Sequence, residues 1–182
     1  MTDSTLQSWP ADLVARAAKV KLACFDVDGT LTDGRLFFDE DHRESKSFHV
    51  LDGQGLVLLR KSGVAVAFVT ARTSKVALNR ARELGVEGHD SVKDKLACIE
   101  DLCARLGIGL DEVAFMGDDL PDLTVLRHVG LAVAPANVHP WIRGEVHWIT
   151  GARGGEGAAR ELCDLVLHAH GKVEVLLAGG HP

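Results

Sequence analysis

Short, continuously apolar runs alternate with longer amphipathic segments along most of the chain. Four runs have the character of strands buried on both faces of a sheet, namely residues 21–25, 64–69, 113–116 and 131–133, with a weaker one at 146–149. Helical patterns lie near residues 54–62, 74–84, 93–106, 121–128 and 156–170, and a short helix from residue 10 to 18 precedes the first strand. This alternation predicts an open α/β sandwich with a central parallel sheet and right-handed crossovers.

Two segments do not fit the alternation. Residues 34–38 and 47–50 flank a charged stretch at 39–44, and this pattern predicts a β-hairpin that follows the first strand and projects from the sheet. Residues 173–182 are apolar and glycine-rich without a clear period, so this tail is either disordered or docked elsewhere. The length of 182 residues is that of one domain, which we expect to span residues 1–182.

Composition narrows the class of partner. The chain has 20 Lys and Arg against 26 Asp and Glu, and a net charge of −6 disfavours binding to nucleic acid or to anionic membranes. Its apolar runs are far shorter than the ~20 residues that span a bilayer. The first residues lack the pattern of a secretory signal, so we expect a cytoplasmic protein acting on a small molecule. No pair of cysteines has C-x-x-C spacing, and we expect reduced thiols in the core.

Acidic residues gather where the predicted strands end. The residues at these positions, with a lysine that opens a following helix, are Asp26, Asp28, Thr70, Lys95, Asp118, Asp119 and Asp122. The carboxyl ends of parallel strands meet at one edge, where ligands bind. Carboxylates brought together there would raise one another's pKa unless a cation neutralised them, and oxygen ligands of this kind suit Mg²⁺. Zinc is disfavoured because no His and Cys set has ligand spacing. The pattern predicts phosphoryl transfer through an aspartyl phosphate.

A purely structural interpretation of some of these residues stays open. Asp and Gly are common at strand ends because they form turns and cap helices. Asp119 can serve as such a cap, and Asp122 can be a first-turn residue that the helix dipole favours.

The motifs Asp26-x-Asp28, Thr70, Lys95 and Gly117-Asp118-Asp119-x-x-Asp122 resemble those of the haloacid dehalogenase-like phosphohydrolases. This resemblance implies a Rossmann-like three-layer fold in which Asp26 is the nucleophile. Asp28 would protonate the leaving alcohol and then activate water, while Thr70 and Lys95 would hold the phosphoryl oxygens. Mg²⁺ would bind Asp26, the backbone carbonyl of Asp28, and Asp118, with Asp119 and Asp122 supporting these ligands.

One branch of that superfamily is more similar, the 3-deoxy-D-manno-octulosonate 8-phosphate (KDO 8-phosphate) phosphatases. The similarity lies in four blocks, at residues 25–34, 48–55, 117–122 and 154–161. It implies hydrolysis of KDO 8-phosphate in the synthesis of lipopolysaccharide precursors. Two departures, Thr30 where Val is usual and Ala71 where Gly is usual, put the substrate in doubt rather than the chemistry.

The chain leaves no room for a cap domain over the site. The segments between Thr32 and Gly55 and between Thr70 and Lys95 are too short to hold one, yet such chemistry requires exclusion of water. The resemblance implies a homotetramer in which the hairpin at 34–50 and a neighbour's C-terminal segment complete the site.

Some residues outside the motifs carry weaker hypotheses. Arg72 would bind the carboxylate of a sugar acid, although it can also be an exposed helix-capping residue. His49 and Asp52 could reach the substrate, and Asp52 could instead cap the helix that starts near Gln54. Trp141 and Trp148 are expected to be core or interface anchors.

Rival functions remain at this stage. One keeps the chemistry and changes the substrate to a nine-carbon ulosonate 9-phosphate or a nucleotide. Another is a receiver-like switch that accepts a phosphoryl group without turnover. The position of the acidic pair on the first strand favours the enzyme, because Asp28 stands ready to hydrolyse the acyl phosphate.

Overall fold

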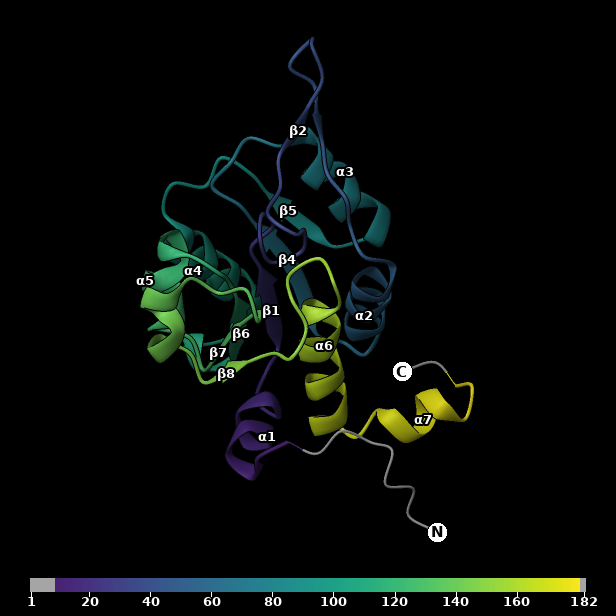
Figure 1. Cartoon of the computed structure of the whole chain (residues 1–182). Helices are drawn as coiled ribbons and strands as arrows, with labels where there is room; N and C mark the ends of the chain where they lie inside the picture. The colour runs from purple at the N-terminus through teal and green to yellow at the C-terminus, as the bar shows by residue number, and fades with distance from the viewer. Residues whose placement is uncertain (1–8, 181–182) are drawn as a thin grey trace.

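A six-stranded parallel sheet forms the centre of the molecule (Figure 1). The structure is a computed structural model that describes residues 9–180. The strand order is β5-β4-β1-β6-β7-β8. The strands are β1 (Leu22–Phe25), β4 (Ala65–Val69), β5 (Glu87–His89), β6 (Val113–Met116), β7 (Leu131–Ala134) and β8 (Trp148–Ile149). The predicted parallel sheet is confirmed, including its weaker last strand.

Helices cover both faces of this sheet, so the architecture is the predicted three-layer sandwich (Figure 1). On one face pack α1 (Ala11–Ala17), α2 (Val50–Lys61), α3 (Lys75–Leu84) and α6 (Ala158–Ala169). On the other lie α4 (Lys95–Leu106) and α5 (Leu123–Leu126). Short 3-10 turns are η1 (Leu110–Glu112), η2 (Leu120–Asp122) and η3 (Pro140–Glu145), and α7 (Val173–Leu177) follows α6.

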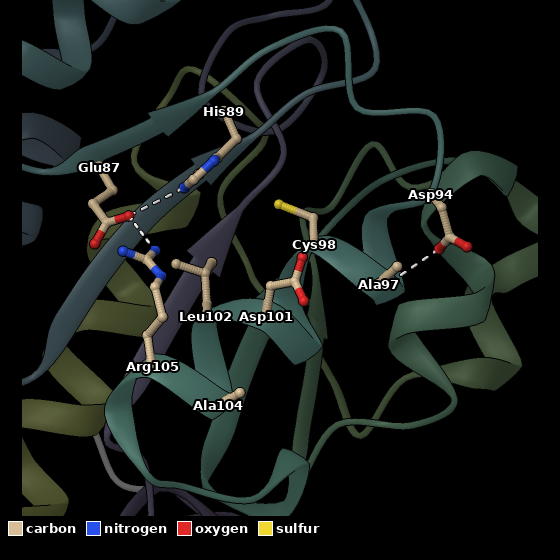
Figure 2. Close-up of a pocket in the computed structure, with 9 residues that line it drawn as sticks. All are labelled: Glu87, His89, Asp94, Ala97, Cys98, Asp101, Leu102, Ala104 and Arg105. Carbon is tan, nitrogen blue, oxygen red and sulfur yellow. Dashed lines mark hydrogen bonds and ion pairs between the residues drawn. The ribbon is translucent and has the colours of Figure 1, made fainter.

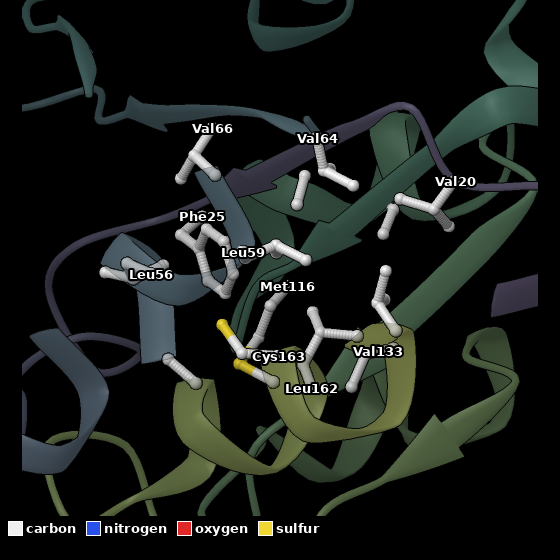
Figure 3. Close-up of a cluster of buried hydrophobic side chains, with 14 of the residues drawn as sticks. Val20, Phe25, Leu56, Leu59, Val64, Val66, Met116, Val133, Leu162 and Cys163 are labelled. Atoms are coloured by element: carbon white, nitrogen blue, oxygen red, sulfur yellow. The ribbon is translucent and has the colours of Figure 1, made fainter. Parts of the chain in front are cut away.

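Strand β1 lies near the middle of the sheet and is buried on both faces. Because side chains alternate along a strand, Phe25 packs into the cluster beneath α2 and α6, whereas Leu22 and Cys24 face α4 and α5. Figure 3 shows the first cluster, in which Phe25 lies near Leu59 and Met116. This double burial explains why the strand contains no polar residue until it reaches the sheet edge at Asp26.

The projecting hairpin is present, but its second strand lies earlier than predicted. Strand β2 (Phe37–Phe38) pairs with β3 (Glu44–Ser45), and residues 47–50 are not a strand. The carboxylate of Asp39 accepts hydrogen bonds from the backbone N–H groups of Asp41 and Arg43 at 3.0 and 2.8 Å, which closes the turn early. Helix α2 consequently starts at Val50 rather than near Gln54. Below, residues 34–50 are called the flap.

Part of the tail is ordered, since residues 173–177 form α7, while residues 181–182 and the N-terminal residues 1–8 lie outside the described part. Trp141 is 75 % exposed, so it is not a core residue. All four cysteines are free thiols, three of them buried. Among residues 9–180, no helix is long and apolar enough to cross a membrane.

Candidate active site

A small cavity of about 160 Å³ opens at the carboxyl ends of β1, β4 and β6. All eight residues predicted from the sequence line it. They are Asp26, Asp28, Thr70, Arg72, Lys95, Asp118, Asp119 and Asp122, joined by Ala71 and Pro121. The strand order places these loops side by side, since β1 lies between β4 and β6. The sheet edge therefore gathers the residues that the motifs predicted.

Asp26 occupies the first position after β1. Its backbone N–H donates to the carbonyl of Met116 at 2.9 Å, which continues the pairing of β1 with β6 and fixes the Asp26 backbone. Its side chain is almost fully buried, and Oδ1 lies 2.5 Å from Nζ of Lys95. The lysine is the first residue of α4, whose N-cap Asp94 accepts a hydrogen bond from the N–H of Ala97. Helix α4 thus places a cation against the carboxylate of Asp26.

Asp122 serves to organise the loop after β6. Its Oδ1 accepts from Nζ of Lys95 at 2.6 Å, and its Oδ2 accepts from the backbone N–H groups of Asp118 and Asp119 at 3.0 and 3.3 Å. Asp119 is exposed and caps η2 by accepting from the N–H of Leu120 at 2.8 Å. For Asp119, the capping role left open by the sequence is therefore observed.

Glycines allow the acidic loops to approach one another. Gly29 has φ +93°, and a Cβ there would overlap the carboxylate of Asp118. A Cβ on Gly117 would overlap the side chain of Asp122. The glycines of both motifs are needed because carboxylates fill the space beside their α-carbons.

Thr30 has a role that the sequence did not reveal. Its side chain is fully buried, and its hydroxyl donates to Oδ1 of Asp118 at 3.0 Å. The departure from Val at this position therefore bears on the orientation of Asp118, whereas the sequence similarity relates it to the choice of substrate. A valine would leave that carboxylate oxygen without this donor.

The carboxylates strongly perturb one another's titration. Burial, followed by the charge of Asp122, raises the pKa of Asp26 to about 7 despite the opposing effect of Lys95. The same two causes raise the pKa of Asp118 to about 7. Burial alone would lower the pKa of Lys95, but the charges of Asp26 and Asp122 outweigh it and raise this pKa. Asp26, Asp118 and Asp122 together carry more negative charge than Lys95 neutralises.

This donor set fits a hard divalent cation. Asp26, Asp118 and Asp122 each offer an oxygen, and the three oxygens lie within 4.8 Å of one another. Every donor is a carboxylate oxygen, which suits Mg²⁺ and disfavours softer metals. Both oxygens of Asp122 are already engaged by Lys95 and by backbone N–H groups, so Asp26 and Asp118 are the better placed ligands.

Thr70 and Arg72 form the wall contributed by β4. The backbone of Thr70 is tied to the segment after β5, since its N–H donates to His89 at 2.9 Å and its carbonyl accepts from Val92 at 3.0 Å. The guanidinium of Arg72 lies 3.1 Å from Oε1 of Glu44 and 3.6 Å from Oδ2 of Asp28. Arg72 does not cap α3, because the side chain of Ser74 does so.

Two flap residues at the site were missed by the sequence analysis. Nζ of Lys46 contacts Oδ1 of Asp28 and lies 3.1 Å from Oε1 of Glu44. Glu44 also accepts a hydrogen bond from the hydroxyl of Ser74 at 2.7 Å. The available signal was the spacing of Glu44 and Lys46, two residues apart as on one side of a strand. Because the second strand of the hairpin was predicted at residues 47–50, this spacing was not recognised as part of a strand.

His49 and Asp52 lie outside the lining of this cavity. The Asp52 carboxylate accepts from the backbone N–H groups of Gly157 and Arg160 at 3.3 and 2.8 Å. It therefore caps α6, and the prediction that it caps its own helix was wrong. Its pKa is raised because burial outweighs these hydrogen bonds.

A wider groove of about 790 Å³ lies between β5 and α4 (Figure 2). Three of its side chains interact with one another, since Glu87 accepts from Arg105 at 2.7 Å and lies 3.2 Å from Nε2 of His89. None of the motif residues lines it. The chemistry predicted from the sequence therefore belongs to the smaller, acidic cavity.

Comparisons with known proteins agree with this geometry. A model of haloacid dehalogenase-like hydrolases matches residues 90–162. The 3-deoxy-D-manno-octulosonate 8-phosphate phosphatase of Yersinia pestis is 40% identical over 90% of this chain and 88% of its own. A hypothetical protein from Xanthomonas campestris has a similar structure, with 57% identity, 98% coverage of both chains and a TM-score of 0.94. The same phosphatase from Moraxella catarrhalis was solved in complex with a magnesium ion, a phosphate ion and a KDO molecule. Its structure is also similar to this one, with a TM-score of 0.90, 37% identity, and coverage of 92% of this chain and 97% of that chain.

Proposed function

Because this chain belongs to the family of 3-deoxy-D-manno-octulosonate 8-phosphate phosphatases among the haloacid dehalogenase-like hydrolases, we propose that it hydrolyses KDO 8-phosphate to KDO and phosphate. The observation that carries this function is the convergence of Asp26, Asp28, Lys95 and Asp118 on one cavity. The product would enter the synthesis of lipopolysaccharide precursors. The chain folds as a capless member of the superfamily, with the flap beside its site.

Asp26 is the nucleophile in this proposal. Its carboxylate attacks the phosphorus of the ester, the bond to the sugar oxygen breaks, and an aspartyl phosphate forms. Lys95 lies 2.5 Å from one oxygen of Asp26 and is bonded to Asp122, so it holds the nucleophile and offsets negative charge on the transferring group. Thr70, which lines the same cavity, would hold a second phosphoryl oxygen.

Asp28 is the general acid and base. It gives a proton to the leaving sugar oxygen in the first half of the reaction. In the second half it takes a proton from the water that attacks the aspartyl phosphate, and Asp26 is released. Its position two residues after the nucleophile, in the same cavity, allows both transfers.

Mg²⁺ is the cofactor, and it would be held by Asp26, Asp118 and the backbone carbonyl of Asp28. When bound, it supplies positive charge that offsets the repulsion between the nucleophile and the phosphate. Thr30 orients Asp118 toward this position through its hydroxyl.

Arg72 supports a sugar acid as the substrate class. Its side chain is 42% exposed at the cavity, and its present partner is the carboxylate of Glu44 at 3.1 Å. The planar guanidinium group of Arg72 already binds one carboxylate, so it can also bind the carboxylate of a sugar-acid substrate.

We further propose that the enzyme is a homotetramer in which neighbouring flaps and C-terminal segments cover the sites. Support comes from exposed apolar side chains on the flap, where Leu36, Phe37 and Phe38 are 44%, 50% and 53% exposed. Leu177 of α7 is 75% exposed as well. Light scattering after size exclusion tests this assembly, and a monomer at working concentration would contradict it.

A phosphate-release assay tests the function. KDO 8-phosphate, a nine-carbon ulosonate 9-phosphate, a nucleotide and p-nitrophenyl phosphate are compared by kcat/KM, each with Mg²⁺ and with EDTA. The proposal predicts Mg²⁺-dependent turnover with KDO 8-phosphate preferred. A higher kcat/KM for another ester would change the substrate, and a stable stoichiometric acyl phosphate would indicate a receiver-like switch.

A further inference from the structure

Lys46 is a buried cation at the root of the flap. Its side chain is 0% exposed, although the flap projects into solvent (Figure 1). Its Nζ contacts Oδ1 of Asp28 and lies 3.1 Å from Oε1 of Glu44. A lysine is buried only when its charge is paired, and here two carboxylates supply the pairing. The flap thus places an ammonium group directly on the proposed acid and base.

The two oxygens of Asp28 have different surroundings. Oδ1 is held by Lys46. Oδ2 is buried and has no hydrogen-bond partner among residues 9–180, since Nε of Arg72 is 3.6 Å away. A buried carboxylate oxygen without a donor is costly and calls for an explanation. Asp28 lines the cavity, so a group bound there can provide the missing partner.

We propose that Lys46 is a positioning residue for Asp28: by holding Oδ1, it keeps Oδ2 free as the oxygen that transfers the proton. This inference rests on the proposed phosphatase function. In the first half-reaction the O–H bond at Oδ2 breaks, and the proton passes to the sugar oxygen as its bond to phosphorus breaks. In the second, Oδ2 takes a proton from water while the water oxygen bonds to phosphorus and the bond from phosphorus to Asp26 breaks.

Glu44 connects this positioning to the docking of the flap. Its Oε1 lies 3.1 Å from both Lys46 and Arg72, and its Oε2 accepts from Ser74 at 2.7 Å. The segment after β4 therefore holds β3 in place, and β3 in turn carries Lys46 to Asp28. Asp28, the proposed general acid and base, is therefore aligned only when the flap lies against the site.

Lys46→Met tests the role of the ammonium group, because methionine has similar length and no charge. Positioned proton transfer contributes about 10²–10⁴-fold to such reactions, and we expect kcat to fall by about 10- to 100-fold. We expect KM to change less than about threefold, since Lys46 is not placed on the substrate. Lys46→Arg keeps a charged donor and should recover part of the lost kcat. Lys61→Met, at the exposed end of α2 and outside the cavity lining, is the matched control and should leave kcat unchanged.

The assay uses both KDO 8-phosphate and p-nitrophenyl phosphate, with the Mg²⁺-loaded enzyme. With the aryl ester the leaving group needs little protonation, so Lys46→Met should release a rapid burst of nitrophenolate followed by slow turnover. An unchanged kcat, or a rise in KM alone, would overturn the inference. Lys46→Gln provides the same comparison if the Met variant does not fold. A wild-type enzyme inactive on both esters would instead overturn the proposed function, and this inference with it.

Discussion

Replacing Asp118 by Asn should stabilise the metal-free protein while removing its response to Mg²⁺. The Asp118 carboxyl has a pKa of about 7 because of burial and the nearby charge of Asp122. Without a cation at neutral or higher pH, the folded protein must hold this group ionised beside Asp26 and Asp122. Asn keeps the shape, can still accept the hydrogen bond from Thr30 and carries no charge.

The magnitude follows from the pKa shift. A rise from 3.8 to about 7 is roughly three units at ~1.4 kcal/mol each, which gives about 4 kcal/mol as an upper limit. Solvent reaches part of the side chain, so we expect about 2 kcal/mol. The unfolded chain loses this proton near pH 3.8 and the folded protein near 7, so wild-type stability falls as the pH rises between these values. The gain from Asn is thus full above about pH 7 and disappears below about pH 4.

Urea unfolding in EDTA at about pH 8 and about pH 5 measures this gain, and titration with Mg²⁺ measures the response to metal. We expect the variant to be more stable than wild type in EDTA, more so at the higher pH, and to lack both the Mg²⁺-dependent increase and phosphatase turnover. A variant less stable than wild type at the higher pH in EDTA would refute the electrostatic reasoning. Equal stabilisation of both proteins by Mg²⁺ would refute the assignment of Asp118 as a ligand.

Three further predictions concern single residues. Arg72→Ala should raise KM for KDO 8-phosphate far more than for p-nitrophenyl phosphate, since only the former has a carboxylate; equal losses on both would remove this role. Asp52→Ala should lower the free energy of unfolding by about 1–2 kcal/mol, because α6 loses its cap; urea unfolding with unchanged KM tests it. Gly117→Ala should lower kcat, since the added Cβ displaces Asp122 and with it Lys95; activity equal to wild type would show that the loop adapts freely.

The sheet and the acidic cavity were predictable because both depend on short-range pattern and simple topology. Short continuous apolar runs are typical of strands buried on both faces, and parallel order then brings their carboxyl ends together. Asp26, Asp28 and Asp118 follow directly from that arrangement, and the structure places them in one cavity.

The remaining features depend on contacts that no local pattern encodes. Asp52 caps a helix more than 100 residues away, and the acceptor of Thr30 is 88 positions along the chain. The register of the flap is set by the hydrogen bonds of Asp39, and a shift of a few residues there hid Glu44 and Lys46. From the sequence alone, polar residues in a projecting segment such as the flap are indistinguishable from a solvent-exposed turn, because their contacts are made with distant parts of the chain.

Trapping the phosphoryl-enzyme tests the central claim most directly. The Mg²⁺-loaded protein is mixed with KDO 8-phosphate and quenched in acid, borohydride reduces the acyl phosphate to an alcohol, and mass spectrometry of the peptides locates the modified residue. The account predicts homoserine in place of Asp26, and no modification or turnover in Asp26→Asn with its fold intact. Modification at another carboxylate, or full turnover by Asp26→Asn, would contradict it.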